Sequence, residues 1–401
     1  MIQYIKNGSV TTVKGFKAAG IHCGIKRKKK DLALLYCDDA CTAAAAFTTN
    51  KVKAAPVVLS QSIIDKSGKA KAILINSGNA NACTGQAGFI DAEKIQAYCA
   101  EKLGVSKDEV LISSTGVIGQ RLPVDTILKG IDTISAELTE DGGLDCAHAI
   151  MTTDTKVKTY AVSVKLSSGE VTIGGMCKGS GMIMPNMATM LGFITTDAEL
   201  DSATLKYHLL QSVNVTFNKI SVDGETSTND MVIALANGKS GIQVAETGED
   251  AELFQSALLS LCKKMARAIV KDGEGATKLV TINISGAASQ QDADLAGKTL
   301  ANSPLVKTAI YGRDANWGRI MSSVGMSGAD VCPEKVSICF DELPILLPGF
   351  NIVLNEEKAL EVLSQKEIQL NVNLNNGDYS STWWTCDFTE NYVKINADYR
   401  T

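Results

Sequence analysis

Thr189 stands where a loop rich in glycine, methionine and asparagine meets a run of strand-forming residues. The segment reads KGSGMIMPNMATMLG over residues 178–192. Its glycines allow tight bends or the close approach of a ligand, and Pro185 favours an extended conformation at Met184. A β-branched residue with a hydroxyl group at the start of a strand, after such a loop, is a candidate nucleophile. On these features alone, a surface loop leading into a strand is the alternative interpretation.

A threonine hydroxyl group is a poor nucleophile unless a base removes its proton. If the peptide bond between Ala188 and Thr189 is cut, the new α-amino group can act as that base. Its unperturbed pKa of about 7.7–8.0 is closer to neutrality than that of a lysine side chain. No histidine is then needed, in a chain with only 3 of them. Attack of the same hydroxyl group on the carbonyl group of Ala188 would produce two fragments, residues 1–188 and residues 189–401.

Acyl transfer also requires hydrogen-bond donors for the oxyanion that forms on the acyl group. The segment SSTGVIG, residues 113–119, offers the hydroxyl group of Thr115 and the backbone N–H of Gly116, after a short predicted strand. The loss of one such donor typically costs about 2.7–4 kcal/mol of transition-state stabilisation. Taken alone, an ordinary turn is the more frequent role of such a segment.

The composition is that of a globular protein with more than one domain. Its 401 residues exceed what a single core usually serves. Hydrophobic residues make up 45% and charged residues 21%, which argues against long disordered stretches. The net charge of -5 gives no reason to expect a nucleic-acid partner. A basic run, KRKKK at residues 26–30, fits a solvated turn or, less often, an anion-binding patch.

The sequence favours a soluble, cytoplasmic protein without a metal centre. Its first residues lack the apolar region of a secretory signal, and no window is apolar enough for a membrane helix. The 11 cysteines show no regular spacing, and the closest pair, Cys37 and Cys41, has no CxxC motif or histidine partner nearby. A zinc site is therefore not indicated. His208, within the helical pattern LKYHLLQSV, is predicted to be a packed helix residue.

Helical and strand-like patterns alternate along the chain, which predicts a mixed α/β or α+β fold of layered sheets and helices. The strand order cannot be deduced from the sequence. Helices are predicted at residues 86–103, 124–138, 201–215 and 249–271, strands at residues 71–75, 110–112, 190–195, 279–284 and 336–340, a β-hairpin at residues 159–166 and 170–176, and loops at residues 76–85 and 113–120.

Several motifs together resemble the ornithine acetyltransferase family, also called bifunctional glutamate N-acetyltransferase/ornithine acetyltransferase. They run from near the N-terminus to the last residue, so the resemblance covers essentially the whole chain. One departure is Glu225 in VDGETSTND, where the family often has aspartate. The motifs are INSGNANACTG, SSTGVIGQRLP, MTTDT, KGSGMIMPNMATML, FNKISVDGETSTND, KDGEGATK, GRDANWGRI and the terminal YVKINADYRT.

The resemblance implies a role for individual residues of this sequence. Thr189 matches the nucleophile that autocatalytic cleavage after Ala188 exposes, and Thr115 and Gly116 match the oxyanion-stabilising pair. A lysine can hold a carboxylate as a point charge, and a glutamate can pair with a substrate ammonium group. The positions that match substrate-binding residues are Thr152, Lys178, Thr189, Glu274, Asn396 and Thr401.

The resemblance also implies a reaction and an architecture. The expected fold is an α/β (α+β) layered sandwich of the ornithine acetyltransferase type, in a self-cleaving enzyme of the N-terminal-nucleophile kind. The acetyl group of N2-acetylornithine would pass to glutamate through acetyl-Thr189, with no metal or bound cofactor. The fragments would assemble as an α2β2 heterotetramer. Whether acetyl-CoA is a second donor stays open, and an amidohydrolase or aminopeptidase that passes the acyl group to water is the alternative, as is a non-enzymatic binding protein.

Overall fold

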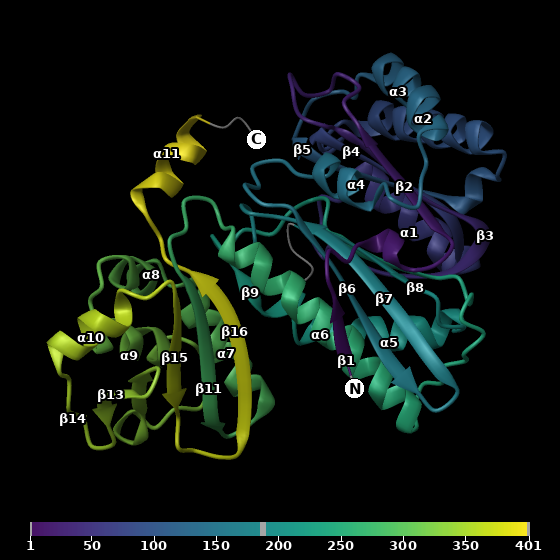
Figure 1. Cartoon of the computed structure of the whole chain (residues 1–401). Coiled ribbons are helices and arrows are strands. Elements are labelled where there is room, and N and C mark those ends of the chain that lie inside the picture. The colour runs from purple at the N-terminus through teal and green to yellow at the C-terminus, as the bar shows by residue number, and fades with distance from the viewer. Residues whose placement is uncertain (1, 185–189, 399–401) are drawn as a thin grey trace. The chain divides into compact units, whose positions relative to one another are not determined.

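The computed structural model describes residues 2–184 and 190–398, which form two compact units (Figure 1). Of the described residues, the first unit comprises those up to Asn218 together with Glu225–Ile269, and the second comprises Lys219–Gly224 together with residues 270–398. The predicted fragment boundary between residues 188 and 189 falls within the sequence range of the first unit. The predicted fragments therefore do not correspond to these units, and cleavage stays a prediction.

The first unit is built around a 9-stranded sheet with the order β1-β6-β7-β8-β10-β3-β4-β5, in which β2 also pairs with β3. Its strands are β1 (Ile2–Ile5), β2 (Phe16–Ile21), β3 (Leu32–Phe47), β4 (Lys69–Asn79), β5 (Val110–Val117), β6 (Lys158–Leu166), β7 (Gly169–Lys178), β8 (Leu191–Thr196) and β10 (Met231–Ala236). Its helices are α1 (Ala55–Ser67), α2 (Gly85–Leu103), α3 (Val124–Ala136), α4 (Gly143–Ala149) and α5 (Ser202–Asn214), with most of α6 (Glu249–Lys271).

Alternating residues of β3 fill two separate cores. Leu32 and Leu34 pack with buried residues of α2 and α3, whereas Ala33 and Leu35 pack with buried residues of α4 and of β7, β8 and β10. Successive side chains of a strand point to opposite faces of a sheet. A strand covered on both faces therefore has an almost continuous run of hydrophobic residues, as this one does.

The four predicted helices are confirmed as α2, α3, α5 and α6, with bounds that differ by at most two residues. α2 ends at Gly104, whose φ of 67° closes the helix in a left-handed conformation that glycine adopts without strain. α5 begins after Asp201, whose carboxylate accepts a hydrogen bond from the backbone N–H of Thr204 at 2.8 Å. His208 is a packed residue of α5, as predicted, with its ring nitrogens bonded to Gln255 and to the carbonyl group of Ala245.

The predicted loops at residues 76–85 and 113–120 are wrong at their beginnings, because β4 and β5 continue through them as a parallel pair. Ser77 pairs with Thr115, and Gly78 pairs with Gly116. The backbones approach so closely here that a Cβ atom added to Gly116 would lie 2.3 Å from the carbonyl carbon of Gly78. Serine, asparagine and glycine are poor strand formers on average, but this pairing requires small residues.

The predicted hairpin at residues 159–166 and 170–176 is confirmed as β6 and β7, and β7 then pairs antiparallel with β8. Lys178, the last residue of β7, lies opposite Leu191, the first residue of β8. The predicted cleavage bond is in the connection between these two strand ends, and Ala188 and Thr189 lie outside the described residues. β8 and β10, from the predicted C-terminal fragment, lie between β7 and β3, from the predicted N-terminal fragment.

The second unit is a 7-stranded sheet with the order β14-β13-β12-β15-β11-β16-β9. Buried residues of the sheet, α7, α8, α9 and α10 form a large core, so the mixed α/β class is confirmed for both units. Its strands are β9 (Ile220–Ser221), β11 (Leu279–Ala287), β12 (Ser337–Phe340), β13 (Leu343–Leu347), β14 (Asn351–Ile352), β15 (Glu367–Asn373) and β16 (Tyr379–Cys386), and its helices are α7 (Gln290–Asn302), α8 (Pro304–Tyr311), α9 (Trp317–Gly325), α10 (Glu356–Leu363) and α11 (Glu390–Asp398).

Among the helices of residues 2–184 and 190–398, none combines the length and the apolar character that a membrane span requires. In the same residues, no group of three or more His, Cys, Asp or Glu side chains is arranged to hold a metal ion.

Candidate active site

Two of the predicted site residues, Thr115 and Lys178, are in contact within the first unit. The ammonium group of Lys178, at the end of β7, donates a hydrogen bond to the hydroxyl oxygen of Thr115, on β5, at 3.3 Å. Both residues are buried, with exposed fractions of 4% and 8%. An ammonium group can only donate, so this bond uses the hydroxyl oxygen of Thr115 as an acceptor and leaves its hydrogen to be donated elsewhere.

Gly116 follows Thr115 and adopts a φ of 132°, a conformation that L-residues with side chains rarely adopt. The parallel pairing with Gly78 fixes its backbone at the end of β5. Asn229 stabilises the same two strand ends by donating hydrogen bonds to the carbonyl groups of Ala80 at 2.6 Å and Ser114 at 2.9 Å. Its buried amide therefore supports the positions of the two predicted oxyanion donors.

Asp154, which is not among the residues predicted from the sequence, links the predicted site residue Thr152 to Gly179, the residue that follows Lys178. Its carboxylate accepts hydrogen bonds from the backbone N–H of Thr152 at 3.0 Å and from that of Gly179 at 2.8 Å. It also forms an ion pair with Lys158 at 2.7 Å, in which both side chains are buried. The segment that carries Thr152 is thereby fixed to the residue that follows Lys178. The acidic residue inside MTTDT was the available signal.

The ionisation of Asp154 depends on its lysine neighbours. Burial alone would raise the pKa of this carboxyl group, but the charges of Lys178 and Lys158 and its hydrogen bonds hold the pKa well below its usual range. Asp154 is therefore ionised at neutral pH. Because two buried lysines surround one buried carboxylate, the local charge is positive, which favours an anion or a developing oxyanion.

Lys26, from the basic run at residues 26–30, is a further residue of this neighbourhood. Its ammonium group donates hydrogen bonds to the carbonyl group of Met151 at 2.6 Å and to that of Lys30 at 2.9 Å. Burial lowers its pKa to about 8, and the nearby charge of Lys178 acts in the same direction. The expected solvated turn is therefore wrong for Lys26, whose side chain is half-buried beside the residue that precedes Thr152.

The remaining described site residues lie in the second unit. Asn396, on α11, donates a hydrogen bond from its amide nitrogen to the carboxylate of Glu274 at 2.9 Å. The turn that carries Glu274 approaches α11 closely, because a Cβ atom added to Gly275 would lie 2.5 Å from the backbone nitrogen of Tyr392. These two predicted substrate residues are thus adjacent. Thr401, like Ala188 and Thr189, lies outside the described residues.

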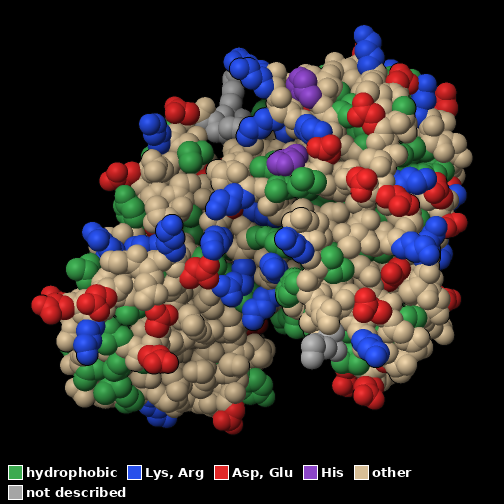
Figure 2. Space-filling model, viewed as in Figure 1, with side chains coloured by type: hydrophobic (Ala, Val, Ile, Leu, Met, Phe, Trp, Pro, Cys, Tyr) green, Lys and Arg blue, Asp and Glu red, His purple; other side chains and the backbone are tan. Residues whose placement is uncertain are grey.

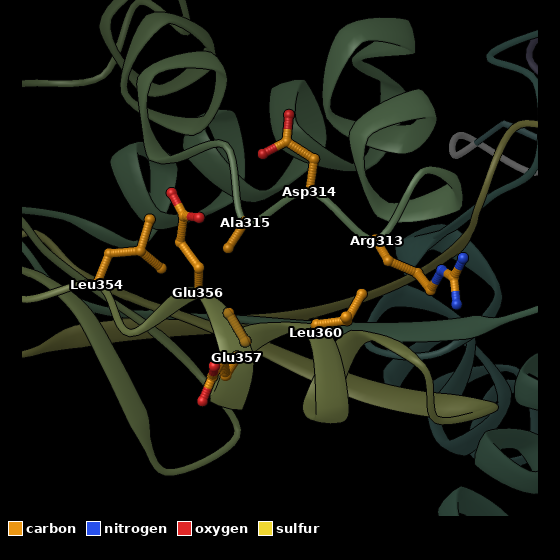
Figure 3. Close-up of a pocket in the computed structure, with 8 residues that line it drawn as sticks. Arg313, Asp314, Ala315, Leu354, Glu356, Glu357 and Leu360 are labelled. Carbon is orange, nitrogen blue, oxygen red and sulfur yellow. The ribbon is translucent and has the colours of Figure 1, made fainter.

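A separate cavity of about 430 Å³ in the second unit contains none of the predicted site residues. Figure 3 shows the side chain of Arg313 directed away from the carboxylates of Asp314 and Glu356. Arg313 and Asp314 belong to the motif GRDANWGRI, one of those that carry the family resemblance. Here they line a cavity together with the alanine and leucine residues Ala315, Leu354, Ala359 and Leu360.

Comparison with known proteins gives a consistent result. The model of the ArgJ family matches residues 17–401. A relative from Caldanaerobacter subterraneus, named arginine biosynthesis bifunctional protein ArgJ, is 48% identical over 402 residues, covering 99% of this chain and 100% of the relative. A relative of the same name from Chlorobaculum tepidum is 48% identical over 388 residues, covering 96% of each chain.

Two solved structures are also similar to parts of this chain. One is the arginine biosynthesis bifunctional protein ArgJ from Bacillus halodurans, with 44% identity, 47% of this chain and 98% of that chain covered, and a TM-score of 0.45. The other is ornithine acetyltransferase from Mycobacterium tuberculosis in complex with ornithine, with 39% identity, 46% and 98% covered, and a TM-score of 0.43.

Proposed function

Because this chain belongs to the ArgJ family, we propose that it transfers the acetyl group of N2-acetylornithine to glutamate in arginine biosynthesis. The names of the curated relatives, which match over nearly their whole length, support the pathway. The observation within this chain that supports acetyl transfer most directly is the hydrogen bond from Lys178 to Thr115. It leaves one hydroxyl hydrogen and a buried positive charge beside Gly116, as an oxyanion site requires.

In the first half-reaction, Thr189 is proposed to attack the acetyl carbonyl carbon of N2-acetylornithine. The α-amino group of Thr189 takes the hydroxyl proton, and the carbonyl oxygen becomes an oxyanion that receives hydrogen bonds from Thr115 and Gly116. The amide C–N bond then breaks, ornithine leaves with the proton, and the acetyl group stays on Thr189 as an ester.

In the second half-reaction, the amino group of glutamate attacks the acetyl ester. The ester bond breaks, Thr189 recovers its proton, and N-acetylglutamate leaves. The residues proposed to bind the amino-acid substrates supply a negative carboxylate, a positive ammonium group, and neutral amide and hydroxyl groups. They are Thr152, Lys178, Glu274, Asn396, Thr401 and Thr189 itself.

The free α-amino group is proposed to arise by autocatalytic cleavage between Ala188 and Thr189. Both sides of that connection are anchored, because Lys178 and Leu191 are paired residues of adjacent strands. Such anchoring supports cleavage in place without the loss of the sheet. We further propose an α2β2 assembly of the two fragments, a cytoplasmic location, no bound cofactor or metal, and acetyl-CoA as a second acetyl donor.

The experiment that tests the proposal supplies the purified protein with N2-acetylornithine and glutamate. Transfer predicts equal amounts of ornithine and N-acetylglutamate, with little acetate. Without glutamate, intact-mass analysis should show one acetyl group on the fragment of residues 189–401. Release of acetate in place of N-acetylglutamate would favour the hydrolase, and the absence of any acetyl adduct would favour a binding protein.

A further inference from the structure

Three basic side chains lie exposed at the tip of the connection between β2 and β3. They are Arg27, Lys28 and Lys29, and none of these side chains forms a hydrogen bond or an ion pair with another residue in the described part of the chain. Lys30, beside them, is paired with Asp145 at 2.8 Å. Figure 2 shows Lys and Arg side chains along the upper edge of the first unit, where this connection projects in Figure 1.

The backbone of this connection is fixed. The carboxylate of Asp31, which is fully buried, accepts hydrogen bonds from the backbone N–H groups of Cys23 at 2.7 Å, Gly24 at 3.2 Å and Lys26 at 2.8 Å. The ring nitrogen Nδ1 of His22 lies 2.9 Å from the carbonyl oxygen of Lys29. A loop that is ordered before binding loses less conformational entropy when a ligand binds. The three charges therefore project from a preformed loop.

The base of the same loop contacts the end of β4, which pairs with the end of β5 that carries the predicted oxyanion donors. A Cβ atom added to Gly78, which pairs with Gly116, would lie 3.0 Å from Cγ of Lys26 and 3.0 Å from Cγ2 of Ile25. The ammonium group of Lys26 is bonded to the carbonyl group of Met151, the residue before Thr152. The loop thus borders the neighbourhood of the acyl-transfer residues in the first unit and directs its tip towards solvent.

We propose that Arg27, Lys28 and Lys29 bind the phosphate groups of a phosphorylated acyl donor, an acetyl thioester of the coenzyme A class. This inference rests on the proposed acetyl transfer. Several phosphate charges at a distance from the acetyl group match several cations at the border of the site, and lysine and arginine are the residues that bind phosphate. An amino-acid donor has no phosphate. The loop therefore contributes to the binding of the coenzyme A thioester and not to the binding of N2-acetylornithine.

The chemical step is the same as for the amide donor. Thr189 attacks the acetyl carbonyl carbon, the C–S bond breaks as the ester forms, and the thiol leaves with the proton that the α-amino group had taken. The amino group of glutamate then takes the acetyl group. The only contribution of the loop is to hold the phosphates, so its removal should act on the KM of the phosphorylated donor.

The test compares three donors with glutamate as the acceptor: acetyl-CoA, acetylpantetheine, which has the thioester but no phosphate, and N2-acetylornithine. In the variant Arg27→Ala/Lys28→Ala/Lys29→Ala, we expect kcat/KM for acetyl-CoA to fall by about 10- to 100-fold, mainly through an increase in KM. One or two modest contacts between a cation and a phosphate group account for each tenfold loss of affinity. The values for the other two donors should stay within about twofold of the wild type.

A matched control removes three exposed lysines of the second unit, Lys335→Ala/Lys358→Ala/Lys366→Ala, and should leave kcat/KM for all three donors unchanged.

An equal loss of kcat/KM with acetylpantetheine would overturn the proposal, because it would show that the loop only supports the site. So would a wild-type enzyme that uses N2-acetylornithine but not acetyl-CoA. That result would leave standing the proposed acetyl transfer from N2-acetylornithine to glutamate. This transfer is contradicted only if N2-acetylornithine gives no N-acetylglutamate.

The source of the phosphate chemistry is tested by inhibition. Adenosine 3′,5′-bisphosphate should compete with acetyl-CoA in the wild type and lose this effect in the triple loop variant, without competing with N2-acetylornithine. Inorganic phosphate that inhibits equally well at the same concentration would overturn the assignment to a nucleotide-bearing donor.

Discussion

The ammonium group of Lys178 donates a hydrogen bond to the hydroxyl oxygen of Thr115, 63 positions earlier in the chain, at a distance of 3.3 Å. This bond joins the end of β7 to the end of β5 and couples a buried charge to a hydroxyl group. Because hydrogen bonds in a chain polarise one another, the bond should make Thr115 a better donor to an oxyanion.

Thr115→Ala should therefore lower kcat by about 100- to 1000-fold with little change in KM. Thr115→Ser, which keeps the hydroxyl group, is the control and should retain most of the activity. Steady-state kinetics of the exchange between N2-acetylornithine and glutamate provide the measurement. A loss confined to KM would argue against an oxyanion role.

Lys178→Met should also lower kcat, and its effect should be smaller when Thr115 is already alanine. If the lysine acts through the hydroxyl group, the double variant loses less than the product of the two single effects. Fully multiplicative losses would show that Lys178 acts on the substrate independently of Thr115.

Asp154→Asn should destabilise the first unit, because it leaves two buried lysines without their carboxylate. Breaking a buried ion pair in this way costs about 3–5 kcal/mol. The pKa of Asp154 is lowered by its neighbours, so its contribution is complete above the ordinary carboxyl range near about pH 4 and is lost as the pH falls towards the native pKa. The difference in unfolding free energy between wild type and variant should thus shrink from pH 7 to pH 3.

Denaturant unfolding at several pH values provides that measurement. The control is Asp38→Asn, which removes an exposed partner of Lys17 and should change stability by less than about 1 kcal/mol. A destabilisation by Asp154→Asn that is the same at every pH would contradict the role given to the charge.

Gly116→Ala should reduce both stability and turnover, because its Cβ atom would lie 2.3 Å from the carbonyl carbon of Gly78 and would force β4 and β5 apart. Gly119→Ala is a close control. Gly119 also has a positive φ, of 80°, but has no atom within 4 Å of an added Cβ. Both variants should show the effect of backbone strain, but only Gly116→Ala should show the additional effect of the close approach between the strands. Thermal unfolding and exchange kinetics provide the measurements. Equal effects would contradict the close approach.

Thr189→Ala should remain one chain of 401 residues and be inactive, because the hydroxyl group is proposed to cut the bond that releases its own amine. Thr189→Ser keeps a hydroxyl group and should still be cleaved. Denaturing gel electrophoresis gives the answer. An alanine variant that still splits in two would end the self-cleavage proposal.

The sequence predicted long periodic elements well and the site's supporting residues poorly. α2 and α6 follow from the spacing of their apolar residues, because packing against a core requires that spacing. The strand ends at Ser77 and Thr115 were predicted as loops, because their pairing depends on contact between two segments that are distant in sequence. Residues that carry their own chemical signal, such as Thr115 and Lys178, were selected. Asp154 and Lys26 act through backbone groups of other segments, and only the fold brings those groups to them.

The position of β8 and β10 between β7 and β3 has a consequence for the refolding of the cleaved protein. Once the bond before Thr189 is gone, denaturation separates two polypeptides, and renaturation becomes a second-order encounter that slows on dilution. The uncut Thr189→Ala chain, in contrast, should refold at a rate independent of concentration. The cleaved protein would then unfold in a first-order process, whereas its refolding would require the association of the two fragments.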